Sequence, residues 1–385
     1  MDFGFSPEQE ALRQEVRAFL DRDEVQAILR EMGQRPFREE LFSLQLHRMM
    51  ADRGWLAAHW PVEYGGGGKT MIEMGIIAEE MIRAGIPHAP WALSVNIFGN
   101  AVLLLGTEEQ RRQYLPPIAR GEALGGVLYT EPDAGSDLAS LRTRAVPHGD
   151  EWIIDGTKIF NTIGHLADYG LAVVRTDPDA TRFRGLTLFV VDMHATGVTV
   201  RPLRMLSDEQ TNEVSLENVR VPARNMVGAP GEGWRLLNTA LSIERTGLDW
   251  TSLAARYLDA VIAMVREKQV GGDRFVRQRI AECYAELQVA RLLVWRVVSN
   301  QALGEFDDIY SAMSKLYGSE LTKRITRLGM EIGGLEALLT RWDGDPLADG
   351  WLEAHYRQAP GTTIAAGTSE IMRYLVAYRG LRVHK

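Results

Sequence analysis

The chain has 385 residues, of which 45% are apolar, 24% charged and 8% aromatic. This composition is typical of a folded protein of two or three domains, and it excludes a disordered or low-complexity chain. Acidic residues outnumber basic ones by 51 to 43, which gives a net charge of −8 at pH 7. Such a chain lacks the generic basic surface that binds nucleic acid or an anionic membrane, so we expect neither as a partner.

The single cysteine, Cys283, excludes an intrachain disulfide and a zinc site built from several cysteines. We expect it to be a buried structural thiol, and we expect no metal. The first ten residues lack the basic region and apolar run of a signal peptide. We also expect no membrane span, because we count no run of about 18 uncharged apolar residues. These features together predict a cytoplasmic protein.

Residues 1–124 are expected to form a helical domain. Ser6-Pro7-Glu8 is a helix start, with a capping serine and a proline in the first turn. Helical spacing of apolar residues continues over 71–81 and 93–105. Gly106-Thr107-Glu108 begins a further helix, which we expect to end at Pro116-Pro117.

Residues 125–229 are expected to form a strand-rich domain. Short apolar runs alternate with turn residues about every ten positions, which is typical of a small barrel or sandwich. The expected strands are 127–130, 152–154, 171–175, 186–191, 198–200 and 214–221. Residues 230–385 return to helical spacing and form the third expected domain. Its expected helices are 236–265, 275–301, 310–332 and 368–381.

Two segments of the strand-rich region carry residues suited to ligand binding. In 129–137 a strand runs into a turn with a glycine and hydroxyl groups, which could bind a flavin edge or an anion or could be a polar turn. In 156–164, Phe160 could form a wall for a flat ligand, although an aromatic residue in a strand more often belongs to the core.

Glu244 is a carboxylate on an apolar helical stripe. Leu237, Leu241, Glu244 and Leu248 follow one another at helical spacing, with small residues beside the acid. Burial raises the pKa of a carboxyl group and makes it a stronger base, so this carboxylate could be a proton acceptor facing a desolvated cavity. By pattern alone, a buried structural ion pair is the more common explanation.

Together these segments resemble the acyl-CoA dehydrogenase family, and the resemblance spans almost the whole chain. The matching motifs, in chain order, are 53–66, 129–137, 152–164, 217–234 and 367–373. The resemblance implies an α+β multidomain fold: an N-terminal α-helical domain, a middle β-barrel and a C-terminal four-helix bundle. It also implies FAD between barrel and bundle. The residues expected at the cofactor are Tyr129, Thr130, Ser136, Phe160, Thr162, Gly334 and Thr368.

The implied reaction is the α,β-desaturation of an acyl-CoA thioester. A carboxylate removes an α proton, a hydride leaves the β carbon for flavin N5, and an electron-transfer flavoprotein collects the electrons. A flavin ribityl hydroxyl and a backbone N–H, here that of Ala366, bind the thioester oxygen. Ser136 also stands where a hydroxyl contacts the cofactor or the pantetheine arm of CoA.

The chain departs from the family pattern at the base. Most members carry it at the position of Ala366, which cannot accept a proton. A minority, including isovaleryl- and long-chain-acyl-CoA dehydrogenases, place it on a helix directly before an arginine. Glu244-Arg245 matches that arrangement, with Arg245 near the substrate. The resemblance and the apolar stripe thus indicate the same residue as the base.

The residues for the far end of the cofactor also depart from the pattern. Arg266 is not followed by the usual Phe, Arg274 stands where a Gln is expected, and Met330 replaces a second Gln shortly before Gly334. Such losses resemble members that work as hetero-oligomers with a related subunit, although an ordinary homo-oligomer is the plainer interpretation. Three functions stay open: a dehydrogenase, a non-catalytic or half-site subunit of such an oligomer, and a flavin oxidase on the same fold.

Overall fold

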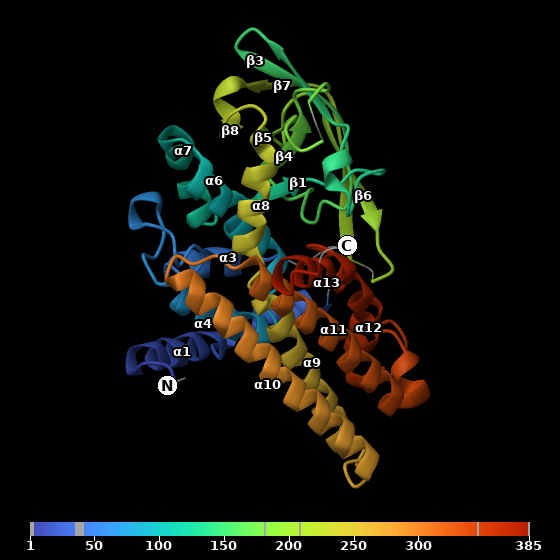
Figure 1. Cartoon of the computed structure of the whole chain (residues 1–385). Helices are drawn as coiled ribbons and strands as arrows, with labels where there is room; N and C mark the ends of the chain where they lie inside the picture. Colours follow the sequence, from blue (N-terminus) through green and yellow to red (C-terminus); the bar gives the residue numbers. More distant parts are fainter. Residues whose placement is uncertain (1–3, 35–41, 181, 208, 345, 384–385) are drawn as a thin grey trace.

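The computed structural model describes residues 4–34, 42–180, 182–207, 209–344 and 346–383. Within these ranges the side chains of residues 33, 34, 239–244, 348 and 349 are outside the description. The chain runs through a helical part, a strand-rich part and a second helical part, in that order (Figure 1). The sheet lies at one end of the molecule, and α8 runs from it toward the helices.

The first helical part follows its predicted start. Ser6 caps the first helix and forms a capping box with Gln9. The last helix of this part corrects the sequence analysis, because it continues through Pro116 and Pro117 to Ala119. The elements are α1 (Pro7–Leu20), α2 (Asp23–Gln34), α3 (Leu44–Ala51), η1 (Val62–Tyr64), α4 (Met71–Ala84), α5 (His88–Trp91), the π-helix η2 (Ala92–Gly99), α6 (Asn100–Leu105) and α7 (Glu108–Ala119).

A second correction concerns the apolar stretch in this part. His88–Leu105 has 18 residues and a mean hydropathy of 1.2, so by length and composition one helical run could cross a membrane. The expectation that no such stretch exists is wrong. However, 56% of it is buried inside the protein, and it packs against β1, α7 and α8. The segment therefore has the surroundings of a core helix, and its apolar character is explained by burial.

The middle part is one eight-stranded sheet with the order β6-β7-β3-β2-β4-β5-β8, and β1 pairs with β4 in parallel. Apolar side chains of these strands, including Ile154, Phe189 and Val219, form a core of their own. The strands are β1 (Gly125–Leu128), β2 (Arg144–His148), β3 (Glu151–Lys158), β4 (Tyr169–Arg175), β5 (Leu186–Asp192), β6 (Val198–Arg204), β7 (Gln210–Pro222) and β8 (Met226–Val227).

The second helical part contains a break where the sequence predicted one helix over 236–265. The chain leaves the helix after Glu244 and begins a new one at Leu248, since Gly247 has a left-handed φ of +77°. The predicted stripe therefore does not extend to Leu248. The helices are α8 (Gly233–Glu244), α9 (Leu248–Glu267), α10 (Arg274–Ala302), α11 (Asp308–Gly333), α12 (Trp351–Thr362) and α13 (Ser369–Leu375), with short turns η5 (Gly334–Leu338), η6 (Leu347–Gly350) and η7 (Val376–Gly380).

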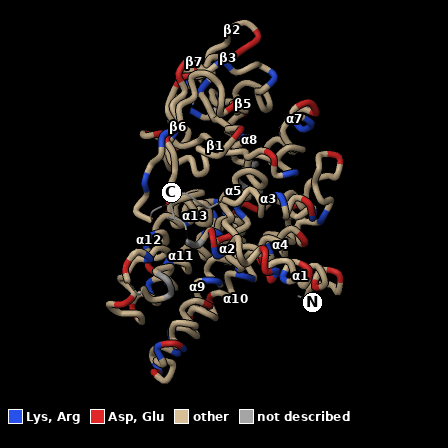
Figure 2. Tube along the Cα trace, turned by 180° about the vertical axis from the view of Figure 1, so that it is seen from behind, with Lys and Arg blue, Asp and Glu red and all other residues tan. Residues whose placement is uncertain are grey.

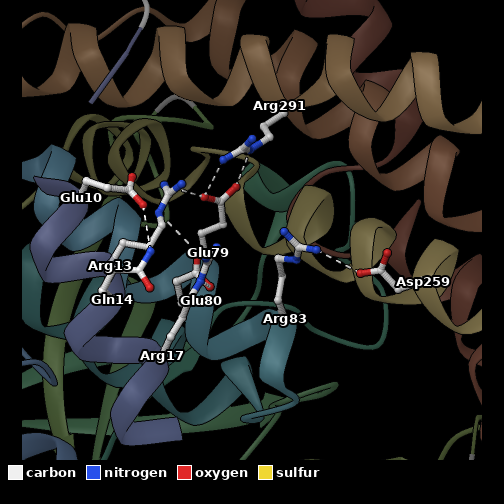
Figure 3. A network of polar contacts seen from close by, with 9 residues as sticks. All are labelled: Glu10, Arg13, Gln14, Arg17, Glu79, Glu80, Arg83, Asp259 and Arg291. Atoms are coloured by element: carbon white, nitrogen blue, oxygen red, sulfur yellow. Dashed lines mark hydrogen bonds and ion pairs between the residues drawn. The ribbon is translucent and has the colours of Figure 1, made fainter. Parts of the chain in front are cut away.

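Buried ion pairs join the two helical parts (Figure 3). Glu79 of α4 accepts hydrogen bonds from Arg13 of α1 at 3.2 Å and from Arg291 of α10 at 2.7 Å. The adjacent Glu80 pairs with Arg17 at 2.8 Å. Several guanidinium groups around two buried carboxylates supply the pairing that such burial requires. This network ties α1 and α10 to the same stretch of α4.

The sheet contacts the second helical part through the turn between β6 and β7. Arg357 of α12 donates to the carbonyl of Leu206 at 2.6 Å, and Gln358 donates to the Glu209 carboxylate. Burial raises the pKa of Glu209. α12 leads directly into the turn that carries Ala366, so these contacts fix where that turn begins.

Charges of both signs follow one another along the same elements, for example around the tip between α9 and α10 (Figure 2). Cys283 is buried in α10, as expected, and burial raises the pKa of its thiol. Within the ranges that the structure describes, no group of three His, Cys, Asp or Glu residues is placed to hold a metal ion.

Replacement of His47 by leucine is expected to flatten the pH dependence of stability in mild acid. His47 of α3 is 5% exposed, and burial lowers its pKa from 6.5 to about 4. As the pH falls from 6.5 to 4, the unfolded chain binds this proton first, so the folded state loses about 1.4 kcal/mol per pH unit. Urea unfolding at several pH values measures the slope. The exposed His148→Leu serves as the control, and an unchanged slope in His47→Leu would contradict the assignment.

Candidate functional site

The two candidate segments of the sheet lie side by side. The N–H of Ile159 donates to the carbonyl of Thr130 at 2.8 Å, so the loop after β3 is tied to the loop after β1. Thr130 and Thr162 are both half-buried. The structure therefore brings together Tyr129, Thr130, Phe160 and Thr162, which belong to segments about 30 positions apart in the sequence.

A buried ion pair holds the loops after β1 and β3 in place. Lys158, fully buried at the end of β3, donates to the Glu131 carboxylate at 2.9 Å and to the carbonyls of Tyr129 and Val173 at 3.1 and 2.8 Å. Glu131 also accepts from the N–H groups of Arg142 and Thr143. Burial lowers the pKa of Lys158 to about 8, although the carboxylate opposes that shift. Sequence reasoning gave these two residues no role.

Phe160 is presented to solvent rather than packed in the core. Its side chain is 53% exposed, and its φ of +57° lies in the left-handed region that residues other than glycine seldom adopt. Ile163, three residues later, has a φ of +56°. Neighbouring hydrogen bonds hold this loop, since Asn161 and Asn212 donate side-chain N–H groups to each other's backbone carbonyls at 3.1 and 2.8 Å. An exposed ring on such a backbone forms a flat apolar surface beside Thr162.

Ser136 lies in the exposed part of the first segment. The neighbouring Asp137 forms an ion pair with Arg182 of the loop between β4 and β5. The hydroxyl of Ser136 is therefore at the surface and not in the buried layer formed by Lys158 and Glu131.

Glu244 is the last residue of α8, and its side chain lies outside the described part of the structure. The turn that follows is well defined by its contacts. Ser314 of α11 donates to the carbonyl of Thr246 at 2.8 Å. A Cβ atom at Gly247 would overlap Ser314 Oγ, so only glycine fits this close approach.

The turn at Ala366 meets the turn after Glu244. Arg245 Nε donates to the carbonyl of Ala366 at 3.2 Å, and Lys315 Nζ of α11 donates to the carbonyl of Gly367 at 2.7 Å. Ala366 and Gly367 both have left-handed φ angles, +56° and +97°. Among the described residues, the N–H of Ala366 donates to no backbone or side-chain acceptor. Thr368 caps α13 by accepting from Ile371 N–H at 3.2 Å.

Two glycines that could have left space for a bulky ligand are instead packing contacts. A Cβ at Gly99 would overlap the ring of Trp60, and Gly247 is in contact with Ser314. Both glycines therefore allow close packing and leave no space for a ligand at these two positions.

Gly334 lies apart from the loops described above. It follows α11 with a φ of +66°, and no atom beyond its chain neighbours lies within 4 Å of the position that a Cβ would take. The neighbouring Leu335 and Leu338 are 85% and 61% exposed. Gly334 therefore belongs to an open apolar surface of the chain.

Comparison with known proteins follows the same division of the chain. Models for the N-terminal, middle and C-terminal domains of acyl-CoA dehydrogenases match residues 6–122, 126–219 and 231–381. The chain belongs to the acyl-CoA dehydrogenase family. It has the three-domain fold of that family, and its members are FAD-dependent oxidoreductases that act on acyl-CoA thioesters.

Individual relatives cover nearly the full length of the chain. Acyl-CoA dehydrogenase FadE26 of Mycobacterium tuberculosis is 31% identical over 400 residues, with 98% of this chain and 97% of the relative covered. The solved Tcur3481-Tcur3483 steroid ACAD is 33% identical with a TM-score of 0.89, and both chains are covered fully at 100%. The ChsE4-ChsE5 complex from Mycobacterium tuberculosis is 30% identical with a TM-score of 0.86, again at 100% coverage of both chains.

Proposed function

We propose that this acyl-CoA dehydrogenase desaturates an acyl-CoA thioester between its α and β carbons, with Glu244 as the base. The observation that carries the proposal is the contact between two turns. Arg245, the residue after Glu244, donates to the carbonyl of Ala366. A carboxylate and a backbone N–H that hydrogen-bonds to no described residue therefore come from adjoining segments, as removal of an α proton requires.

The residues of the sheet fit a flavin. A flat ring system needs an apolar surface for its face and hydroxyl or N–H donors for its edge, and the exposed Phe160 and the half-buried Thr130 and Thr162 offer both. We assign these residues, with the backbone of Tyr129 and with Ser136 and Thr368, to FAD. When bound, FAD would accept the hydride that leaves the β carbon.

Glu244 would take the α proton. Its place at the end of α8 puts it one residue from Arg245, which holds the turn of Ala366. Because a thioester α proton is weakly acidic, the base needs help from groups that stabilise the negative oxygen formed in the transition state. The N–H of Ala366 is the donor that we assign to that oxygen. Arg245, which donates through Nε to the Ala366 carbonyl, holds the turn that presents this N–H.

A related second subunit is the partner that the sequence favours for the far end of the cofactor. Met330 and the residues around Arg266 lack the side chains that usually hold it, and Gly334 lies in an open apolar surface. Two of the similar solved structures are named as complexes of two different chains. We propose that this chain pairs with such a subunit and passes its electrons to an electron-transfer flavoprotein. Domains of 1–124, 125–229 and 230–385 remain our proposed division.

An absorption spectrum, followed by anaerobic titration with acyl-CoA esters, tests the proposal. We expect a flavin band that bleaches with one class from a panel of straight, branched and sterol-derived esters. The steroid relative is the reason for the last class. A flavin that every thioester leaves oxidised would contradict the proposal. A protein that is colourless alone and gains flavin and activity with a co-purifying chain would agree with the pairing proposed above and would make this chain one half of a shared cofactor site. Peroxide release in air would instead indicate an oxidase.

A further inference from the structure

Lys315 is a completely buried lysine for which the reaction proposed above has no role. It lies in the N-terminal third of α11 with an exposed fraction of 0%, and its Nζ is 5.9 Å from the ring centre of Trp250. An ammonium group is costly to remove from water unless its donors are used. One donor is directed away from its own helix, to the carbonyl of Gly367 at 2.7 Å. That is a short, charge-assisted hydrogen bond.

The turn that Lys315 holds has an unfavourable backbone conformation. Ala366 and Gly367 are consecutive residues with left-handed φ angles of +56° and +97°. Alanine pays a steric penalty in this region, so the surrounding contacts must impose it. The two carbonyls of the pair each accept from a cationic side chain, Ala366 from Arg245 and Gly367 from Lys315.

The positions of Arg245 and Lys315 both depend on α11. Ser314, the residue before Lys315, donates to the carbonyl of Thr246 and so fixes the turn that carries Arg245. Adjacent residues of α11 therefore hold the turn after Glu244 and the turn at Ala366. A shift of either turn would change the distance between the base and the N–H of Ala366.

We propose that Lys315 is a positioning residue that, together with Arg245, holds the Ala366–Gly367 turn so that the N–H of Ala366 stays available to the thioester oxygen. The proposal rests on the proposed function. It assigns no contact between Lys315 and substrate. Its effect on the reaction is exerted through the backbone of the turn.

The test compares Lys315→Met with Lys323→Met, an exposed lysine two turns further along α11. We expect Lys315→Met to lower kcat about 100-fold, the size of effect seen when one oxyanion donor is lost, with KM changed less than about threefold. Amide hydrogen exchange of the whole protein should become at least about tenfold faster in 361–368 and stay unchanged in the rest of α11. Lys315→Gln, which keeps a shorter neutral donor, should fall between the two. Lys323→Met should match the parent protein.

Each other outcome overturns the inference. Unchanged exchange in 361–368 would show that Lys315 does not hold the turn. Faster exchange throughout α11, with a matching fall in melting temperature, would show a general structural role. If the parent protein desaturates no thioester, the proposed function fails, and the exchange experiment still decides whether Lys315 holds this turn, because it needs neither cofactor nor substrate.

Discussion

Replacing Glu244 with glutamine is expected to reduce the rate of flavin reduction by acyl-CoA at least about 10³-fold. Glutamine has nearly the same shape but cannot accept the α proton, and a positioned general base contributes roughly 10²–10⁴-fold to such a step. We propose no other carboxylate for this role, since the family's more common position is occupied by Ala366. The rate is measured by anaerobic stopped-flow absorption with a substrate that reduces the parent protein.

Controls must show that the substitution removes the proton acceptor without disturbing flavin or substrate binding. Glu244→Gln should keep the flavin spectrum and should bind acyl-CoA with an affinity within a fewfold of the parent. Glu267→Gln, at the exposed end of α9, should reduce its flavin at the parent rate. Full turnover in Glu244→Gln would remove this residue from the mechanism and would direct attention to the other open functions.

The order of the three parts along the chain could be predicted from the sequence, because apolar residues are spaced differently in the helical parts and in the strand-rich part. Apolar spacing indicated most long helices, and alternation of apolar runs with turns indicated six of the strands. β2 was missed because it is a short, mostly exposed strand that contains Pro147. α12 was missed too, as were α2 and α3. The π-helix η2 reads as an ordinary apolar helix, since the bond pattern that distinguishes it leaves no mark in side-chain spacing.

The break between α8 and α9 shows where sequence reasoning ends. The sequence shows Gly247 only as a small residue beside an acid. In the structure, the close approach of Ser314, which is 67 positions away, is what requires glycine there. The same holds for Lys158 and Lys315. A lysine in a strand or a helix is normally exposed, and only tertiary contacts reveal that each of these is buried against backbone carbonyls. Candidate residues could be named from motifs, whereas the residues that hold them in place could not.

Replacement of Lys158 by methionine is expected to destabilise the protein by about 3–5 kcal/mol, the usual effect of leaving one partner of a buried ion pair uncompensated. Methionine fills a similar volume, but Glu131 would keep only the N–H groups of Arg142 and Thr143. The carbonyl of Tyr129 would lose its donor, so we also expect flavin to dissociate more readily from the loop that follows. Denaturant unfolding and flavin release by dilution measure the two effects.

The double variant Lys158→Met with Glu131→Gln supplies the decisive comparison. If Lys158→Met is destabilising mainly because it leaves the Glu131 carboxylate buried without its cation, Glu131→Gln should restore part of the lost stability. The effects of the two substitutions on the free energy of unfolding should then not be additive. Lys268→Met breaks an ion pair with Glu336 at the surface and should cost at most about 1 kcal/mol. Equal losses at Lys158 and Lys268 would mean that burial of the first pair has no energetic consequence. If the double variant releases flavin as slowly as the parent protein, the unpaired Glu131 carboxylate is what disturbs the loop. If the double variant still releases flavin faster, the lost hydrogen bond to the carbonyl of Tyr129 is the cause.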